Sequence, residues 1–128
     1  FDGDYFSFEN CISLPRPVNG SIPVIVGGHS KTAARRAGRL GDGFFPGSAS
    51  IAEIGELITL VRRTAEDHGR DPDAIEMIAG AGAPPGPKLD ERIEQLEAIG
   101  VTHAIVPTFR PDQLEEIGRS LNATYASA

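Results

Sequence analysis

The sequence predicts an α/β protein built from four consecutive βα units. Short apolar runs alternate along the chain with longer stretches whose apolar residues recur at helical spacing. Glycine or proline stands at most of the boundaries between the two kinds of segment. Such alternation is typical of a parallel sheet whose strands are joined by right-handed helical crossovers. The periodicity is compatible both with an open sheet and with part of a barrel.

Length and composition restrict the class of protein. The 128 residues suffice for one ordinary domain, and a net charge of −6 disfavours a nucleic-acid partner. The sequence has no apolar run of the ~20 residues that a membrane span requires and no secretory signal pattern, so we expect a cytoplasmic protein. The single cysteine, Cys11, excludes an internal disulfide and a cysteine-based metal cluster. The first residue is Phe1 and not Met, which indicates a processed piece or a fragment.

The first predicted βα unit follows an irregular segment. Residues 1–22 mix aromatic residues with Gly, Asn and Pro without a sustained period, so we interpret them as a connecting segment before a domain of residues 23–128. The apolar run 24–26 predicts a strand covered on both faces. A helix is expected from Lys31 to Leu40, capped by Ser30, with Gly41 as a left-handed stop.

The second predicted unit has the clearest helix signature. A short strand is expected at Phe44 and Phe45, between Gly43 and a proline. Ser50 and Glu53 then form an S-x-x-E capping box. The apolar residues that follow lie on one helical stripe: Ile54, Leu57, Ile58, Val61 and Ala65. The helix is predicted to end near residues 68–69.

The third and fourth units complete the pattern. Strands are predicted at 75–79 and 101–106, each followed by a helix, with Gly100 ending the third helix. His103 lies inside the fourth strand, where we expect a core histidine. The Gly/Pro-rich loop 80–88 is long enough to shape a substrate entrance, and a plain connector explains it equally well.

The junction after the first strand has the residue types of an anion site. Gly27 and Gly28 lack a Cβ atom, so a ligand can approach the backbone. The backbone amides of residues 29–32 are expected to be unpaired at the start of the helix, where the macrodipole favours negative charge. The hydroxyls of Ser30 and Thr32 would add donors. The alternative interpretation is a tight βα turn in which Ser30 is only a helix cap.

Several motifs resemble those of luciferase-like monooxygenases, a family that includes bacterial luciferase and flavin- and deazaflavin-dependent enzymes. They are IPVIVGG at 22–28, the helix start at 30–33 and GDGFFP at 41–46. The segments FDGDYFSFEN and AEDHGRDPDAIEM are also similar to family segments, so the resemblance covers nearly the whole chain.

This resemblance implies a TIM (β/α)8 barrel, of which the four units would be the second half. It implies a cofactor, FMN or the deazaflavin coenzyme F420, and a small organic substrate. The cofactor phosphate would bind at Gly27, Gly28, His29 and Ser30, with weaker assignments for Thr32 and Gly43. A family barrel needs about 250 residues, so we expect self-association or a separate N-terminal half. The sequence identifies neither an acid–base pair nor a metal site.

A second function is also compatible with the sequence. The chain would then be an open-sheet α/β domain that binds a phosphorylated small molecule without catalysis. A third possibility is a structural part of an assembly. A cofactor absorbance would distinguish the redox function from the other two.

Overall fold

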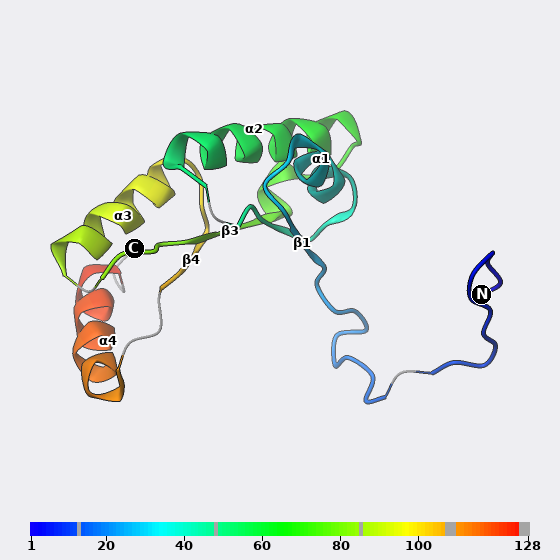
Figure 1. The fold of residues 1–128 in the computed structure, drawn as a ribbon, viewed down its shortest axis with the longest axis horizontal. Coiled ribbons are helices and arrows are strands. Elements are labelled where there is room, and N and C mark those ends of the chain that lie inside the picture. Colours follow the sequence, from blue (N-terminus) through cyan, green and yellow to red (C-terminus); the bar gives the residue numbers. More distant parts are fainter. Residues whose placement is uncertain (13, 48, 85, 107–109, 126–128) are drawn as a thin grey trace.

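A computed structural model describes residues 1–12, 14–47, 49–84, 86–106 and 110–125. It contains four strands and four α-helices in strict alternation (Figure 1), as the sequence predicts. The elements are β1 (Ile25–Gly27), α1 (Lys31–Leu40), β2 (Gly43–Phe45), α2 (Ile51–Asp67), a 3-10 turn η1 (Pro72–Ala74), β3 (Glu76–Gly80), α3 (Pro87–Ala98), β4 (His103–Ile105) and α4 (Pro111–Tyr125).

The strands form one parallel sheet in the order β1-β2-β3-β4. Gly27 at the end of β1 pairs with Phe45 at the end of β2, and Gly80 at the end of β3 pairs with Ile105. The carboxyl ends of all four strands therefore lie along one edge of the sheet. Loops that leave this edge form the ligand sites of most parallel α/β proteins.

The core lies between the sheet and helices α1, α2 and α3, which run along one side of it (Figure 1). Phe44, Met77 and Ala79 point into this layer and are fully buried. They form one buried cluster with residues of the three helices. These are Ala34 and Ala37 of α1, Ile54, Val61 and Ala65 of α2, and Leu89 and Leu96 of α3. The apolar stripe predicted for residues 54–65 is thus buried, as expected of an amphipathic helix.

The opposite face of the sheet has no such cover within the described residues. Ile25 in β1 is 40% exposed and Val24 before it 57%, so the prediction of a strand covered on both faces is wrong. His103 in β4 is also exposed, and the prediction of a core histidine is wrong. Both predictions assumed a second layer, whereas the helices cover one face only and β1 and β4 are the outer strands.

The helix caps behave largely as predicted. The hydroxyl oxygen of Ser30 accepts a hydrogen bond from the amide of Ala33 at 3.1 Å. Ser50 and Glu53 form the predicted capping box in full. Gly41 does not have the predicted left-handed conformation, because its φ of −85° and ψ of 151° are extended. A glycine is still favoured there, since a Cβ atom would lie 3.0 Å from the side chain of Val26.

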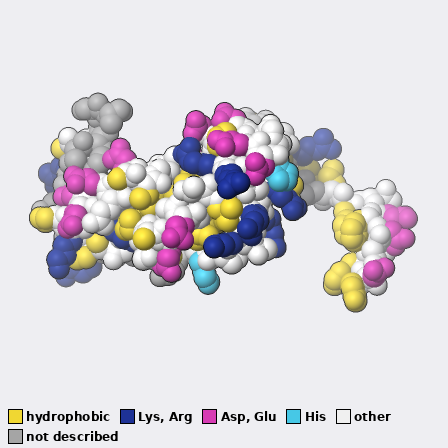
Figure 2. All heavy atoms as spheres, turned by 90° about the horizontal axis from the view of Figure 1, so that it is seen from above, with side chains coloured by type: hydrophobic (Ala, Val, Ile, Leu, Met, Phe, Trp, Pro, Cys, Tyr) yellow, Lys and Arg dark blue, Asp and Glu magenta, His cyan; other side chains and the backbone are white. Residues whose placement is uncertain are grey.

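The described part of residues 1–22 leads away from this body (Figure 1), and Figure 2 shows the N-terminal end standing apart from it. The described part of the segment holds one antiparallel bridge, between Asp2 and Ser7, and stacked rings of Phe1 and Phe8 with centroids 5.2 Å apart. Among all residues that the structure describes, no helix combines the length and apolar character needed to cross a bilayer.

Candidate functional site

The glycine–serine junction, residues 27–32, connects the end of β1 to the start of α1. The Gly28 amide donates a 3.0 Å hydrogen bond to the carbonyl of Phe45, which fixes the junction against the end of β2. Gly28 has a φ of +127°, and a Cβ atom there would approach that of Ala33 to 3.0 Å. Position 28 therefore requires glycine, both for its backbone conformation and for the space beside α1.

Backbone donors are available at this junction. Ser30 satisfies the amides of Ala33 and Ala34 through its hydroxyl and carbonyl oxygens. The amides of Lys31 and Thr32 make no hydrogen bond to another described residue, as is usual in the first turn of a helix. Gly27 has open space on its Cβ side, with nothing within 4 Å of that position. Free amides, an open approach and the positive end of the α1 dipole together suit a bound anion.

His29 and Lys31 border a small cavity of about 200 Å³ between the junction and the first turns of α2. Glu53 and Glu56 lie on its other side. The pKa of Glu53 is lowered, first by the hydroxyl of Ser50 and then by the Ser50 amide, both of which donate to its carboxylate. This cavity is therefore lined by both signs of charge.

The structure brings most of the predicted site residues together. Gly27, Gly28, His29 and Ser30 form the junction, whereas the Thr32 side chain lines a different hollow along α1 with Arg36. Gly43 does not join them. It pairs with Ile25 at the other end of the short strands, and it is buried where a Cβ atom would lie 2.5 Å from the Ile25 side chain. Gly43 thus makes room for packing inside the sheet.

Sequence reasoning missed a hollow of about 840 Å³ beside the ends of β2 and β3. We call it the α3 hollow. Its walls come from the end of β2 (Phe45), the start of α2 (Ile54), the loop after β3 (Gly80 to Ala83) and α3. The glycine-rich loop singled out in the sequence therefore lines a cavity. The overlooked signal was the pair Lys88 and Arg92, which begins at the last residue of that loop and spans one helical turn.

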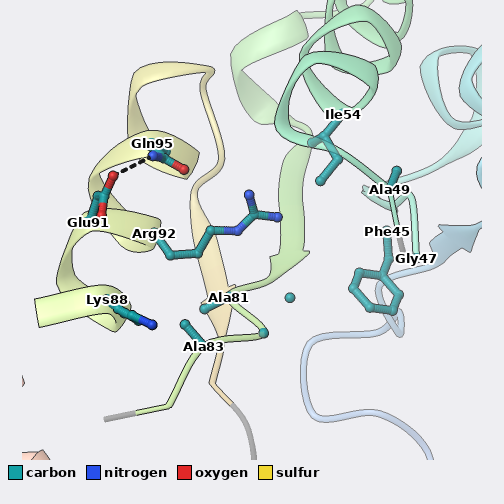
Figure 3. A pocket seen from close by; sticks show the side chains of 12 residues that line it. Phe45, Gly47, Ala49, Ile54, Ala81, Ala83, Lys88, Glu91, Arg92 and Gln95 are labelled. Atoms are coloured by element: carbon teal, nitrogen blue, oxygen red, sulfur yellow. Dashed lines mark hydrogen bonds between the residues drawn. The ribbon is translucent and has the colours of Figure 1, made fainter. Parts of the chain in front are cut away.

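Figure 3 shows how the polar side chains of α3 lie around this hollow. Arg92 extends across it toward Ile54, and Lys88 points toward Ala83. Glu91 is turned the other way and accepts a hydrogen bond of 3.2 Å from Gln95. Neither Lys88 nor Arg92 is paired with a carboxylate of the described residues.

Comparison with known families gives one broad match. The model of a family described as "Luciferase-like monooxygenase" matches residues 1–126. This agrees with the resemblance found in the sequence motifs.

Curated relatives are longer than this chain. An uncharacterized protein of Mycobacterium tuberculosis is 34% identical over 107 residues, which are 83% of this chain and 35% of that protein. An F420-dependent glucose-6-phosphate dehydrogenase of Mycolicibacterium fortuitum is 36% identical over 80 residues, 61% of this chain and 24% of the enzyme. The chain thus spans about a third or less of the length of these relatives.

Solved structures confirm the fold class. A coenzyme F420-dependent tetrahydromethanopterin reductase from Methanopyrus kandleri matches with a TM-score of 0.68 at 16% identity, over 91% of this chain and 54% of that chain. A long-chain alkane monooxygenase matches with a TM-score of 0.70 at 14% identity, over 97% of this chain and 46% of that chain. At these identities the likeness concerns the fold, which is the predicted partial TIM barrel.

Proposed function

Because the chain belongs to the luciferase-like monooxygenase family, we propose that it is part of a flavin- or deazaflavin-dependent oxidoreductase that holds the cofactor phosphate at the glycine–serine junction. In such enzymes the bound cofactor supplies the redox chemistry, and the protein supplies position and electrostatics. The contribution of this chain would be to fix the phosphate end and thereby the location of the reactive ring.

One observation carries this proposal: the junction has free donors beside an open backbone. The amides of Lys31 and Thr32 have no described acceptor, and the Cβ side of Gly27 is empty. The Ser30 hydroxyl accepts from the Ala33 amide, which leaves its own proton available for a phosphate oxygen. Ser30 caps α1, and this role is compatible with phosphate binding because one hydroxyl can accept and donate together.

The relatives favour testing the deazaflavin first. The dehydrogenase of Mycolicibacterium fortuitum is named for its dependence on F420, and its match to this chain reaches 36% identity. FMN stays the second candidate, because the resemblance of the sequence motifs to luciferase-like monooxygenases implies either a flavin or a deazaflavin cofactor.

A closed (β/α)8 barrel requires more strands than the four that the structure describes. The described sheet has four strands with outer edges at β1 and β4, and its uncovered face carries Ile25 and Ile105, which are 40% and 52% exposed. We propose that an N-terminal half, or a second copy of the chain, completes the barrel and covers this face. Burial of those apolar side chains would favour the association.

The alternative function is a non-catalytic α/β domain that binds a phosphorylated small molecule at the same junction. The free amides support it equally, because they recognise phosphate and not the ring. A ring-dependent difference in affinity separates the two functions.

Calorimetric titration of the chain with F420, with FMN and with inorganic phosphate tests the proposal. Gly27→Val places a branched side chain in the open approach, where a Cβ atom would have nothing within 4 Å. Ala52→Val, on the exposed surface of α2, is the control for added volume.

We expect at least about tenfold weaker cofactor binding for Gly27→Val, from loss of hydrogen bonds to a charged group, and unchanged binding for Ala52→Val. Equal affinities of wild type and Gly27→Val would overturn the junction as the phosphate site. Equal affinities for cofactor and inorganic phosphate would favour the non-catalytic alternative.

A further inference from the structure

The α3 hollow has the size and position of a small-molecule site. Its volume of about 840 Å³ lies in the range of ligand pockets in proteins. Phe45 and Gly80 place it at the carboxyl ends of β2 and β3, the edge of the sheet from which the glycine–serine junction also leaves.

Two cations project into the hollow from one helix. Arg92 is half-buried and Lys88 exposed, and they are one turn apart on α3. No described carboxylate pairs with either side chain. The acidic lining residue Glu91 is turned toward Gln95 and accepts a hydrogen bond from it (Figure 3). In a chain with a net charge of −6, an arginine held over a cavity without a counter-ion marks a place where an external anion is favoured.

The remaining walls are apolar. The apolar lining residues surround the hollow that the Arg92 side chain crosses (Figure 3). They are Phe45, Ala49, Ile54, Ala81 and Ala83. Backbone at Gly80 and Gly82 is open, since nothing lies within 4 Å of a Cβ position at either residue. An apolar wall with one cationic end matches a ligand that has an apolar body and one charged group.

The α3 hollow borders the glycine–serine junction. Ala49 lines both the hollow and the cavity that contains His29 and Lys31. Phe45 connects them as well, because its side chain lines the hollow and its carbonyl accepts the hydrogen bond from Gly28. A molecule in the hollow would therefore lie beside a ligand held at the junction.

We propose that the α3 hollow is the substrate subsite and that it takes a small organic anion, whose carboxylate or phosphate pairs with Arg92 and Lys88 while its apolar body packs on Phe45 and Ile54. Its role as a substrate site rests on the proposed oxidoreductase function, whereas anion binding there does not. The guanidinium of Arg92 offers two parallel donors to an oxyanion, and Lys88 adds a point charge.

The test uses three probes of equal apolar length: hexanol, hexanoate and hexyl phosphate. Binding to the ¹⁵N-labelled chain is followed by NMR, with the amides of Ala81 and Gly82 and the Arg92 side-chain resonance as reporters. We expect both anions to bind about tenfold or more tightly than hexanol, as for hydrogen bonds to charged groups. Whichever anion binds more tightly identifies the headgroup.

Arg92→Met should abolish the preference for the anions, and Arg92→Lys should retain part of it. Arg39→Met, on exposed α1, is the control for removing a positive charge elsewhere. Circular dichroism checks that each variant is folded. An unchanged anion preference in folded Arg92→Met, or equal binding of hexanol, would overturn the subsite.

These outcomes are independent of the junction. Anion binding that survives Gly27→Val, in a chain that binds no cofactor, would leave the subsite intact and remove the proposed oxidoreductase function. Cofactor binding without any anion preference would overturn the subsite and leave the proposed oxidoreductase function intact.

Discussion

The guanidinium of Arg70 closes the carboxyl end of α1, where its Nη2 atom donates a 2.7 Å hydrogen bond to the carbonyl of Gly41. Its Nη1 atom donates to the carbonyls of Gly38 at 2.8 Å and Ala37 at 3.3 Å. Helices end with carbonyls that lack a partner and carry partial negative charge. Arg70, which follows α2 in the sequence, thus connects the end of α1 to the second βα unit.

Replacing Arg70 by Met should lower the free energy of unfolding by about 1.5–3 kcal/mol, the range for hydrogen bonds to charged groups. Urea denaturation measures the change. Arg36→Met removes an exposed arginine of α1 that has no hydrogen-bond or ion-pair partner among the described residues, and a change within about 0.5 kcal/mol is expected. Similar losses of unfolding free energy in both variants would show that positive charge alone, and not the Arg70 hydrogen bonds, stabilises α1.

Gly38 permits the close approach of α1 and α2. A Cβ atom there would lie 2.5 Å from the carbonyl oxygen of Val61 and 2.7 Å from the Cβ of Thr64. Gly38→Ala should therefore destabilise the protein by about 1–3 kcal/mol through overpacking, despite the better helix propensity of alanine.

Gly55→Ala is the matched comparison, since its Cβ atom would meet Ile99 at an ordinary 3.6 Å. Here the propensity gain should dominate and raise the stability by up to about 1 kcal/mol. Thermal unfolding of both variants measures these changes in stability. Stabilisation by Gly38→Ala would contradict the close packing of α1 and α2.

The Ser50–Glu53 capping box should make stability depend on pH. The hydroxyl of Ser50 and its amide donate to the Glu53 carboxylate and lower its pKa. A lowered pKa in the folded state means that the stabilisation is complete above the ordinary glutamate pKa and is lost as the pH falls through the folded value. Glu53→Gln should therefore be less stable than wild type at neutral pH, and the difference should shrink in acid.

Urea midpoints measured from neutral to acidic pH test this expectation. Glu56→Gln, one turn along the exposed side of α2, controls for the loss of a carboxylate. A difference between wild type and Glu53→Gln that stays constant with pH would exclude the capping box as its source.

Thr102 extends the pairing of β3 with β4 through its side chain. Its hydroxyl oxygen accepts a 2.9 Å hydrogen bond from the amide of Met77, a fully buried residue. Thr102→Val leaves that amide without the acceptor and should cost about 1–3 kcal/mol, whereas Thr102→Ser should cost less.

Hydrogen exchange at the Met77 amide gives a local measurement, and faster exchange is expected in Thr102→Val. Thr59→Val serves as the control, because the Thr59 hydroxyl donates to the Gly55 carbonyl on the exposed side of α2. Unchanged exchange at Met77 would show that another acceptor replaces Thr102.

Local features were predictable from the sequence. The caps at Ser30 and Ser50 and the stripe from Ile54 to Ala65 depend on residues within a few positions of one another, so the pattern contains the information. The order of the four βα units followed from the same periodicities.

Features that depend on several layers were not predictable. The exposure of Ile25 and His103 reflects which face of the sheet the helices cover, and neither strand's own pattern encodes this. The α3 hollow requires Phe45, Ile54 and Arg92 to meet from three separate elements. The position of Gly43 opposite Ile25 follows from strand register, which a motif does not specify.

The order of strands in the sheet has a consequence for synthesis of the polypeptide. Each strand pairs with the one made just before it, so every new βα unit has its docking partner ready when it leaves the ribosome. The outer edges of β1 and β4 are the exceptions, because neither edge pairs with another strand of the described chain. Until other strands cover these edges, they are where two nascent copies would join by mistake.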